Sequence, residues 1–173
     1  MSDTDLMTLL KEMDKEFGGG FEVDDGIHFA RINRDGCKVF EADGKEPAYI
    51  LSWKIDGGAF TGKQFGDFLR WHSDDKDKAK IRHGVVTSMV KGVTLNSDES
   101  NHPEIQAAYV ALLQSKDTEG SIEALDALVA SFGDVRMPIR LVTSKTGYQN
   151  AKYLEKGKAI VATDPREVEA VTV

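Results

Sequence analysis

Residues 47–72, PAYILSWKIDGGAFTGKQFGDFLRWH, are the most informative stretch of this chain for its fold. Between Tyr49 and Ile55 the largest apolar side chains fall on alternate positions, which is typical of a strand with one buried face. Asp56-Gly57-Gly58 favours a turn, and the residues from Lys63 to His72 favour a second strand. The stretch therefore predicts two antiparallel strands joined by a glycine-rich turn.

Further strand-like segments lie on both sides of this pair. Residues 27–40 indicate a strand, a turn around Arg34-Asp35-Gly36 and another strand. Residues 135–142 and 148–154 indicate two more strands near the end of the chain. Pro138 cannot donate a hydrogen bond to a neighbouring strand, so we expect its strand at a sheet edge or the proline at a bulge.

Helical patterns fill the middle of the chain and its beginning. Ser73-Asp74-Asp75 is a strong start signal for a helix that ends near Gly92, and His102 and Ser121 open two more, the last ending at Gly133. Residues 4–17 carry an apolar stripe at helical spacing, and three glycines follow at 18–20.

These elements predict a mainly β protein with helical additions, of the α+β class. The order of strands and helices fits a five-stranded barrel of the OB type with a helical insert between strands 3 and 4. We expect an N-terminal helix and glycine linker over residues 1–20, an OB-type domain over 21–157 with its insert at about 74–132, and a C-terminal tail over 158–173.

The charge is unevenly distributed along the chain. The 173 residues have a formal net charge of −7, which alone argues against a nucleic-acid partner. Residues 26–92 and 131–158, which hold the predicted strands, are nevertheless net positive, whereas 1–25 and 93–130 are net negative. The local field decides where a polyanion binds, so the strands remain candidates for a binding surface.

Other features of the composition predict the cellular setting. No apolar run approaches the ~20 residues of a membrane span, and the N-terminus lacks the apolar core of a secretory signal. The single cysteine, Cys37, fits a reducing cytosol. We therefore expect a cytoplasmic protein without membrane contact.

Aromatic and basic side chains mix along the predicted strands, as a surface that stacks unpaired bases and holds phosphates requires. Phe68 shares a strand face with Gly66 and Arg70, so we expect it to be exposed, whereas Trp53 should be buried. Of the two tyrosines on opposite faces of the last strand, one should point outward. The predicted nucleic-acid-binding residues are Arg31, Lys38, Lys54, Lys63, Phe68, Arg70, Trp71, Arg136, Arg140, Lys145, Tyr148, Lys152 and Tyr153.

Catalytic and metal motifs are weak in this sequence. The histidines and Cys37 lack metal-ligand spacing, and no nucleophile motif is present. Asp67 and Asp134 are the carboxylates that a metal-dependent nuclease could use at strand ends. We expect a protein that is not an enzyme, with no catalytic residues, no metal and no cofactor.

The stretch from Tyr49 to Trp71, with its IDGGAFTGKQF turn, resembles the second and third strands of bacteriophage single-stranded DNA-binding proteins of the OB type. Residues 125–154, with MPIRLVTSKTGYQNAKYL, are similar to the closing hairpin of those proteins. The resemblance covers roughly residues 26–94 and 122–157. It departs from the family in the long acidic helical segment between Leu95 and Gly120 and in a tail without a dense acidic, Phe-terminated end.

The resemblance implies a protein that binds single-stranded DNA with little sequence preference, as an accessory of phage replication or recombination. It implies single-stranded DNA and phage replication or recombination proteins as partners, in the cytoplasm of the host cell. The acidic helices are expected to face away from the DNA and to contact a partner or a second copy of the chain. Two alternatives stay open. One is a protein-interaction or assembly module on a barrel scaffold, and the other is a metal-dependent nucleic-acid enzyme.

Overall fold

The computed structural model describes residues 23–147 and 149–153. The expected N-terminal helix, its glycine linker, Tyr148 and the C-terminal tail lie outside these residues. Along the described part of the chain, two groups of strands flank a group of helices. In chain order the elements are β1 (Gly26–Ile32), the 3-10 turn η1 (Arg34–Gly36), β2 (Lys38–Phe40), β3 (Ala48–Ile55), β4 (Gln64–Leu69), α2 (Lys76–Asn96), the 3-10 turn η2 (Glu99–Asn101), α3 (His102–Leu113), α4 (Thr118–Ser131), β5 (Arg136–Thr143) and β6 (Gln149–Tyr153).

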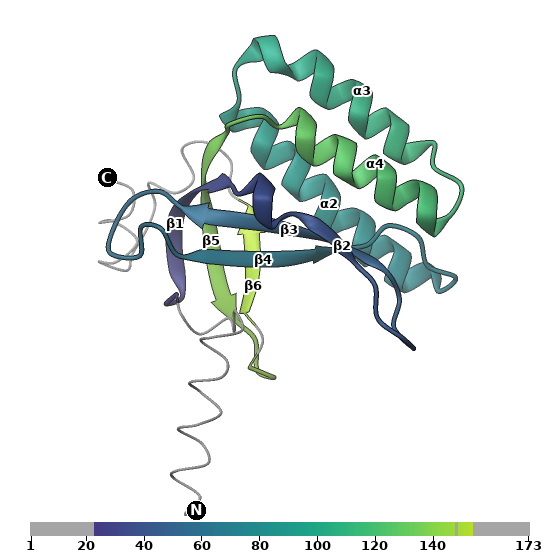
Figure 1. Ribbon diagram of the computed structural model, residues 1–173, viewed down its shortest axis with the longest axis horizontal. Coiled ribbons are helices and arrows are strands. Elements are labelled where there is room, and N and C mark those ends of the chain that lie inside the picture. The colour runs from purple at the N-terminus through teal and green to yellow at the C-terminus, as the bar shows by residue number, and fades with distance from the viewer. Residues whose placement is uncertain (1–22, 148, 154–173) are drawn as a thin grey trace, which may run out of the picture.

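The described strands form one curled antiparallel sheet, a half-barrel (Figure 1). β3 pairs along one edge with β4 and along the other with both β1 and β2, which η1 separates. β1 pairs in turn with β5, and β5 with β6. If β1 and β2 are taken as one interrupted strand, the helices lie between the third and fourth strands, where the sequence predicts them.

The three α-helices of the described part gather on one side of the sheet (Figure 1). α2 packs against β4, β5 and β6, α4 packs against β3, and α3 packs against the other two helices. A polar contact attaches α4 to the sheet, because the Tyr49 hydroxyl donates to Asp126 Oδ1 at 2.7 Å and Arg34 donates to that hydroxyl at 3.1 Å. Burial and the hydrogen bond to Asp126 raise the pKa of Tyr49 above its ordinary value.

The predicted alternation of β3 is confirmed. Its inward side chains fill the space between sheet and helices, whereas Lys54 on the other face is exposed. The inward residues of β3, all buried, are Tyr49, Leu51, Trp53 and Ile55. Helices α2 and α4 contribute the opposite wall of this core, which includes Met89, Val93, Leu125, Leu128 and Val129.

Two helix boundaries differ from the sequence expectation. α2 is capped by Asp75 as predicted, but it continues past Gly92 to Asn96, because Val93 is drawn into the core. α4 begins at Thr118, not at Ser121, because the Asp117 side chain accepts the Gly120 amide at 2.7 Å and caps the helix earlier. Gly133 ends the helical segment as expected, with a φ of 63°.

The expectation that Pro138 marks an edge strand is wrong. Its strand, β5, lies between β1 and β6. Pro138 faces Phe29 of β1, and the described pairs with β6 begin one residue later, at Ile139. The pairs between β1 and β5 run one to one from residue 136 to residue 141, so the alternative expectation of a bulge at Pro138 is not met either.

The two ends of the sheet approach each other through a side-chain contact. Asp67 of β4 and Tyr153 of β6 both lie on the inward face, since their partners in register are Leu51 and Ile139. The Tyr153 hydroxyl donates to Asp67 Oδ2 at 2.8 Å. Burial raises the pKa of the Asp67 carboxyl despite this hydrogen bond, and burial also raises the pKa of Tyr153.

Replacing Asp67 by asparagine is expected to make stability less dependent on pH. Because the folded-state pKa of Asp67 is raised, the folded protein holds this proton at pH values where the unfolded chain has lost it. The contribution is therefore fully present below the unfolded pKa and is lost as the pH rises through the folded pKa. Each tenfold difference in proton affinity between the two states corresponds to about 1.4 kcal/mol.

The check is urea unfolding of wild type and Asp67→Asn at about pH 4.5 and about pH 7.5, since asparagine keeps an acceptor for the Tyr153 hydroxyl. The variant should gain stability relative to wild type at the higher pH. Equal pH dependence of the two proteins would contradict the raised pKa.

Candidate nucleic-acid interface

The outer face of the sheet is the one turned away from the buried side chains of β3. Strand register decides which residues meet there, because directly opposed residues of two strands point to the same face. Ile50 lies between Lys38 of β2 and Phe68 of β4, and Lys54 lies opposite Arg31 of β1. The face therefore has an aromatic part near β2 and β4 and a basic part near β1.

The aromatic part is built on Phe40 and Phe68. Their ring centroids are 5.4 Å apart at an interplanar angle of 87°, an edge-to-face pair that reaches across β3. Phe68 is 52% exposed, as its neighbours Gly66 and Arg70 predict. A large exposed ring held by a second ring is a surface on which an unpaired base can stack.

The basic part is a row of three cations on three adjacent strands. Register places Arg31 of β1 directly opposite Lys54 of β3 on one side and opposite Arg136 of β5 on the other. Like charges that face each other across strands repel, so counter-charges beside this row would stabilise the sheet. We call these three residues the cation row.

Asp56, which follows β3, bridges the two arginines of the row. Its Oδ2 accepts from Arg31 Nε at 2.7 Å and lies 3.3 Å from Arg136 Nε. Its backbone carbonyl accepts from Arg136 Nη2 at 2.8 Å. The hydrogen bond from Arg31 holds the pKa of Asp56 below its ordinary value. Arg136 also lies over the Phe29 ring, 4.3 Å from its centroid.

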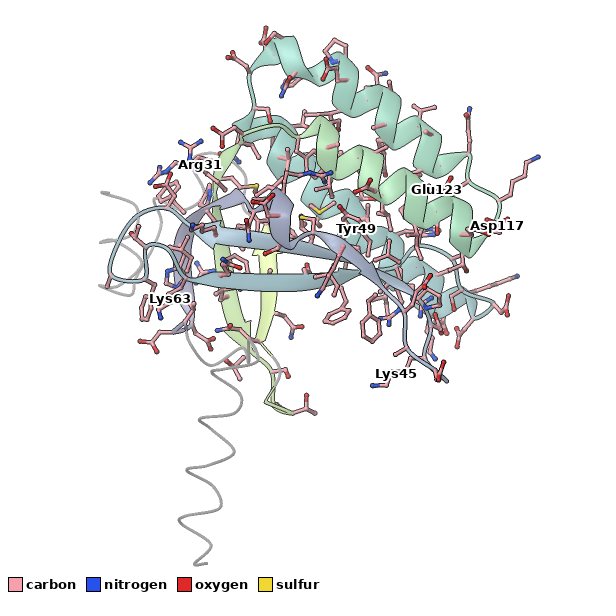
Figure 2. All side chains as sticks on the ribbon, in the orientation of Figure 1. Arg31, Lys45, Tyr49, Lys63, Asp117 and Glu123 are labelled. Atoms are coloured by element: carbon pink, nitrogen blue, oxygen red, sulfur yellow. The ribbon has the colours of Figure 1, made fainter. Side chains whose placement is uncertain are left out.

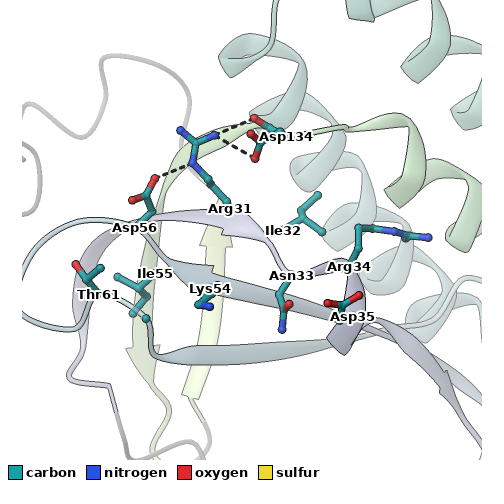
Figure 3. Close-up of a pocket in the computed structure, with 11 residues that line it drawn as sticks. Arg31, Ile32, Asn33, Arg34, Asp35, Lys54, Ile55, Asp56, Thr61 and Asp134 are labelled. Atoms are coloured by element: carbon teal, nitrogen blue, oxygen red, sulfur yellow. Dashed lines mark hydrogen bonds and ion pairs between the residues drawn. The ribbon is translucent and has the colours of Figure 1, made fainter.

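A second carboxylate reaches Arg31 from the other side. Asp134, just before β5, places Oδ1 3.1 Å from Arg31 Nη1, and its carbonyl accepts from the same nitrogen at 3.1 Å (Figure 3). Arg31, Lys54 and both carboxylates line an open cavity of about 530 Å³ between η1 and the 56–62 loop.

The turn η1 covers the middle of the outer face. Ser52 is on this face yet only 7% exposed. A Cβ on Gly36 would lie 2.8 Å from Ser52 Cβ, too close for any other residue without movement of the backbone. Glycine at this position lets η1 lie directly on β3, which separates the aromatic part from the cation row.

The remaining predicted cations are spread around the sheet. Lys38, Lys63, Lys145 and Lys152 are exposed. Lys152 of β6 lies opposite Arg140 of β5, which extends the basic face to β6. Lys63 lies in the loop before β4, at the same end of the sheet as Arg31 (Figure 2). These positions are compatible with a strand of phosphates that crosses the outer face.

Three predicted binding residues point elsewhere in this structure. Trp71 is 5% exposed and stacks on His83, with ring centroids 3.9 Å apart. Tyr153 is turned inward to Asp67. Arg70 is partly buried, and its Nη2 donates to the Glu46 carbonyl at 3.1 Å. The ring of Trp71 and the hydroxyl of Tyr153 are thus already engaged within the protein.

Sequence reasoning missed three residues of this site. Phe40 had a readable signal, because it lies two residues after Lys38 in the same strand and so on the same face. No signal in the sequence marks Asp56 or Asp134 as a partner of an arginine. They lie in loops that are far apart in the chain, and only the folded sheet brings them to Arg31.

No cluster of three or more metal-ligating side chains exists among the residues that the structure describes. In the same part of the chain, no helix is long and apolar enough to cross a membrane.

Comparison of the chain with protein-family models, curated proteins and solved structures gives no match.

Proposed function

We propose that this protein binds single-stranded DNA with little sequence preference on the outer face of its sheet, as a phage replication or recombination accessory. The observation that carries the proposal is the joint presence, on one face, of the cation row and an aromatic pair in which Phe68 is exposed and Phe40 half-buried. Stacking on Phe40 and Phe68 would hold bases of any identity, and the basic residues would hold the phosphates between them.

The strand order supports an OB-type barrel as the scaffold. The path β4–β3–β1–β5–β6, with helices between β4 and β5, is the order expected when β1 and β2 form the first strand of such a barrel. The hydrogen bond between Tyr153 of β6 and Asp67 of β4 joins the two ends of this path. In OB barrels the face of strands 2 and 3 binds oligonucleotides, and those strands correspond here to β3 and β4.

The proposal includes no catalytic step. The carboxylates considered for a metal-dependent nuclease are separated, since Asp67 points inward to Tyr153 and Asp134 pairs with Arg31. A binding protein needs neither a cofactor nor a metal on this face. The proposed location is the cytoplasm of the host cell.

Salt should weaken binding strongly. If about four phosphates are neutralised, the logarithm of affinity for oligo(dT) should fall with the logarithm of salt concentration with a slope of about −3. The measurement is the fluorescence anisotropy of a labelled oligonucleotide, because Trp53 and Trp71 are both buried and would report poorly on binding.

A matched pair of variants locates the contact. Lys54→Gln should make the slope less steep by about 0.7, the share of one phosphate on a single strand. Lys116→Gln removes an exposed charge between α3 and α4 and should leave it unchanged. Affinity that is independent of salt, or equally strong binding to a duplex of the same length, would reject the proposed function.

A protein-assembly module is the second candidate, and one observation favours it. Helix α3 has twelve residues, and its one acidic residue, Glu104, lies in the first turn. Near its other end the apolar side chains of Val110 and Leu113 are 40% and 53% exposed. A second copy of this chain is the partner we would test. The oligonucleotide titration separates the two functions, since an assembly module would leave the anisotropy of the labelled DNA unchanged.

A further inference from the structure

Arg31 occupies the centre of the cation row, and its guanidinium is already held by two carboxylates. Asp56 approaches from the loop after β3, and Asp134 from the loop before β5 (Figure 3). A phosphate needs the same N–H donors, because carboxylate and phosphate oxygens both accept hydrogen bonds from a guanidinium. A phosphate that bonds to Nε or Nη1 of Arg31 must therefore compete with one of these acids.

The two carboxylates differ in what they hold. Asp56 links Arg31 to Arg136 and also offers its carbonyl to Arg136, so its removal would leave two facing arginines without their bridge. The Asp134 side chain pairs with Arg31 and is 84% exposed. Exposed ion pairs contribute little to stability, so this contact is easily exchanged.

The backbone around Asp134 allows that exchange without unfolding. Phe132 and Val135, which are 0% and 5% exposed, anchor the two ends of the connection in the core. Gly133 between them adopts a φ of 63°. Rotation of the Asp134 side chain is enough to move its carboxylate away from Arg31 Nη1. The Asp134 backbone carbonyl can continue to accept a hydrogen bond from the same nitrogen.

We propose that Asp134 is a built-in competitor for phosphate at Arg31: it holds the guanidinium in the free protein and gives way to a phosphate of the bound strand. The inference rests on the proposed function and adds a determinant of affinity to it. A competitor of this kind weakens capture of single anions and leaves a ligand with many phosphates able to bind, since the other cations hold that ligand while Asp134 is displaced.

The test compares two variants that change the net charge equally. Asp134→Asn removes the competing charge at nearly constant shape. Glu123→Gln removes an exposed charge on α4, among the helices and away from Arg31 (Figure 2). Labelled oligo(dT) is titrated with each protein at several salt concentrations, and thermal unfolding checks that all variants are folded.

Asp134→Asn is expected to bind oligo(dT) roughly twofold to fivefold more tightly than Glu123→Gln, the range that an exposed ion pair allows. Its salt slope should be steeper by about 0.7, because Arg31 then neutralises a phosphate without first losing a carboxylate. In an Arg31→Gln background the gain from Asp134→Asn should vanish, since the two residues act as a pair.

Equal affinities for Asp134→Asn and Glu123→Gln would overturn the inference, because the effect would then be one of net charge. Weaker binding by Asp134→Asn than by wild type would also overturn it and would make Asp134 a positioning residue for Arg31. Both results leave the proposed function standing. If wild type itself fails to bind oligo(dT) at low salt, the proposed function fails, and the inference fails with it.

Discussion

Replacing Trp53 by alanine is expected to lower the free energy of unfolding by about 3–5 kcal/mol. The side chain is fully buried at 0% exposure in the middle of β3, and its ring lies 5.9 Å from that of Tyr153. Alanine would leave a large cavity between the sheet and the helices, and the surrounding side chains can fill it only in part. Urea unfolding followed by circular dichroism measures the loss.

Phe68→Ala is the matched control for stability, since it removes an aromatic ring from the opposite face of the same strand pair. At 52% exposure, Phe68 should contribute less than about 1 kcal/mol. The reverse outcome, a severe loss for Phe68→Ala and a mild one for Trp53→Ala, would mean that the two faces of β3 and β4 are exchanged. A register error of one residue has that consequence.

The same Phe68→Ala variant is expected to weaken binding of oligo(dT) by about 1–3 kcal/mol, which is the range for loss of one base–aromatic stack. The variant keeps its fold, so the loss belongs to the surface and not to the core. Phe40→Ala should weaken binding in the same direction, because Phe40 supports the Phe68 ring edge to face. Anisotropy of labelled oligo(dT) measures both effects.

Leu113→Ala is the control for this binding prediction. Leu113 is 53% exposed, almost the same as Phe68, but it lies at the end of α3 and not on the sheet. Its replacement should leave the affinity unchanged. A loss as large as that of Phe68→Ala would place the binding surface on the helices and contradict the proposed interface.

Local sequence patterns are sufficient to predict the individual strands and helices. Alternation between residues 49 and 55 identifies both β3 and its buried face, and Asp75 identifies the start of α2. The exposure of Phe68 follows from its neighbours in the same strand. Each of these features depends on residues a few positions apart, so periodicity and capping record them directly in the sequence.

Contacts between distant segments cannot be read in this way. The internal position of β5 makes the edge expectation for Pro138 wrong, and packing against α2 turns Trp71 onto His83. Tyr153 points inward because it pairs with Ile139 of β5, and its hydroxyl then meets Asp67, which lies in another strand at the opposite end of the sheet. These outcomes depend on which segments become neighbours, and local sequence carries no record of that choice.

For the described part of the chain, the order of amino acids is thus enough to show which strands and helices form, which face of β3 is buried, and that cations and aromatic residues are abundant on the strands. Folding adds the position of Arg31 between Lys54 and Arg136 and the support that Phe40 gives to Phe68. It also brings the counter-charges to the centre of the cation row. The physical reason is that the register between strands is fixed by the packing of the whole core. The counter-charges come from loops whose positions are known only once that core has formed.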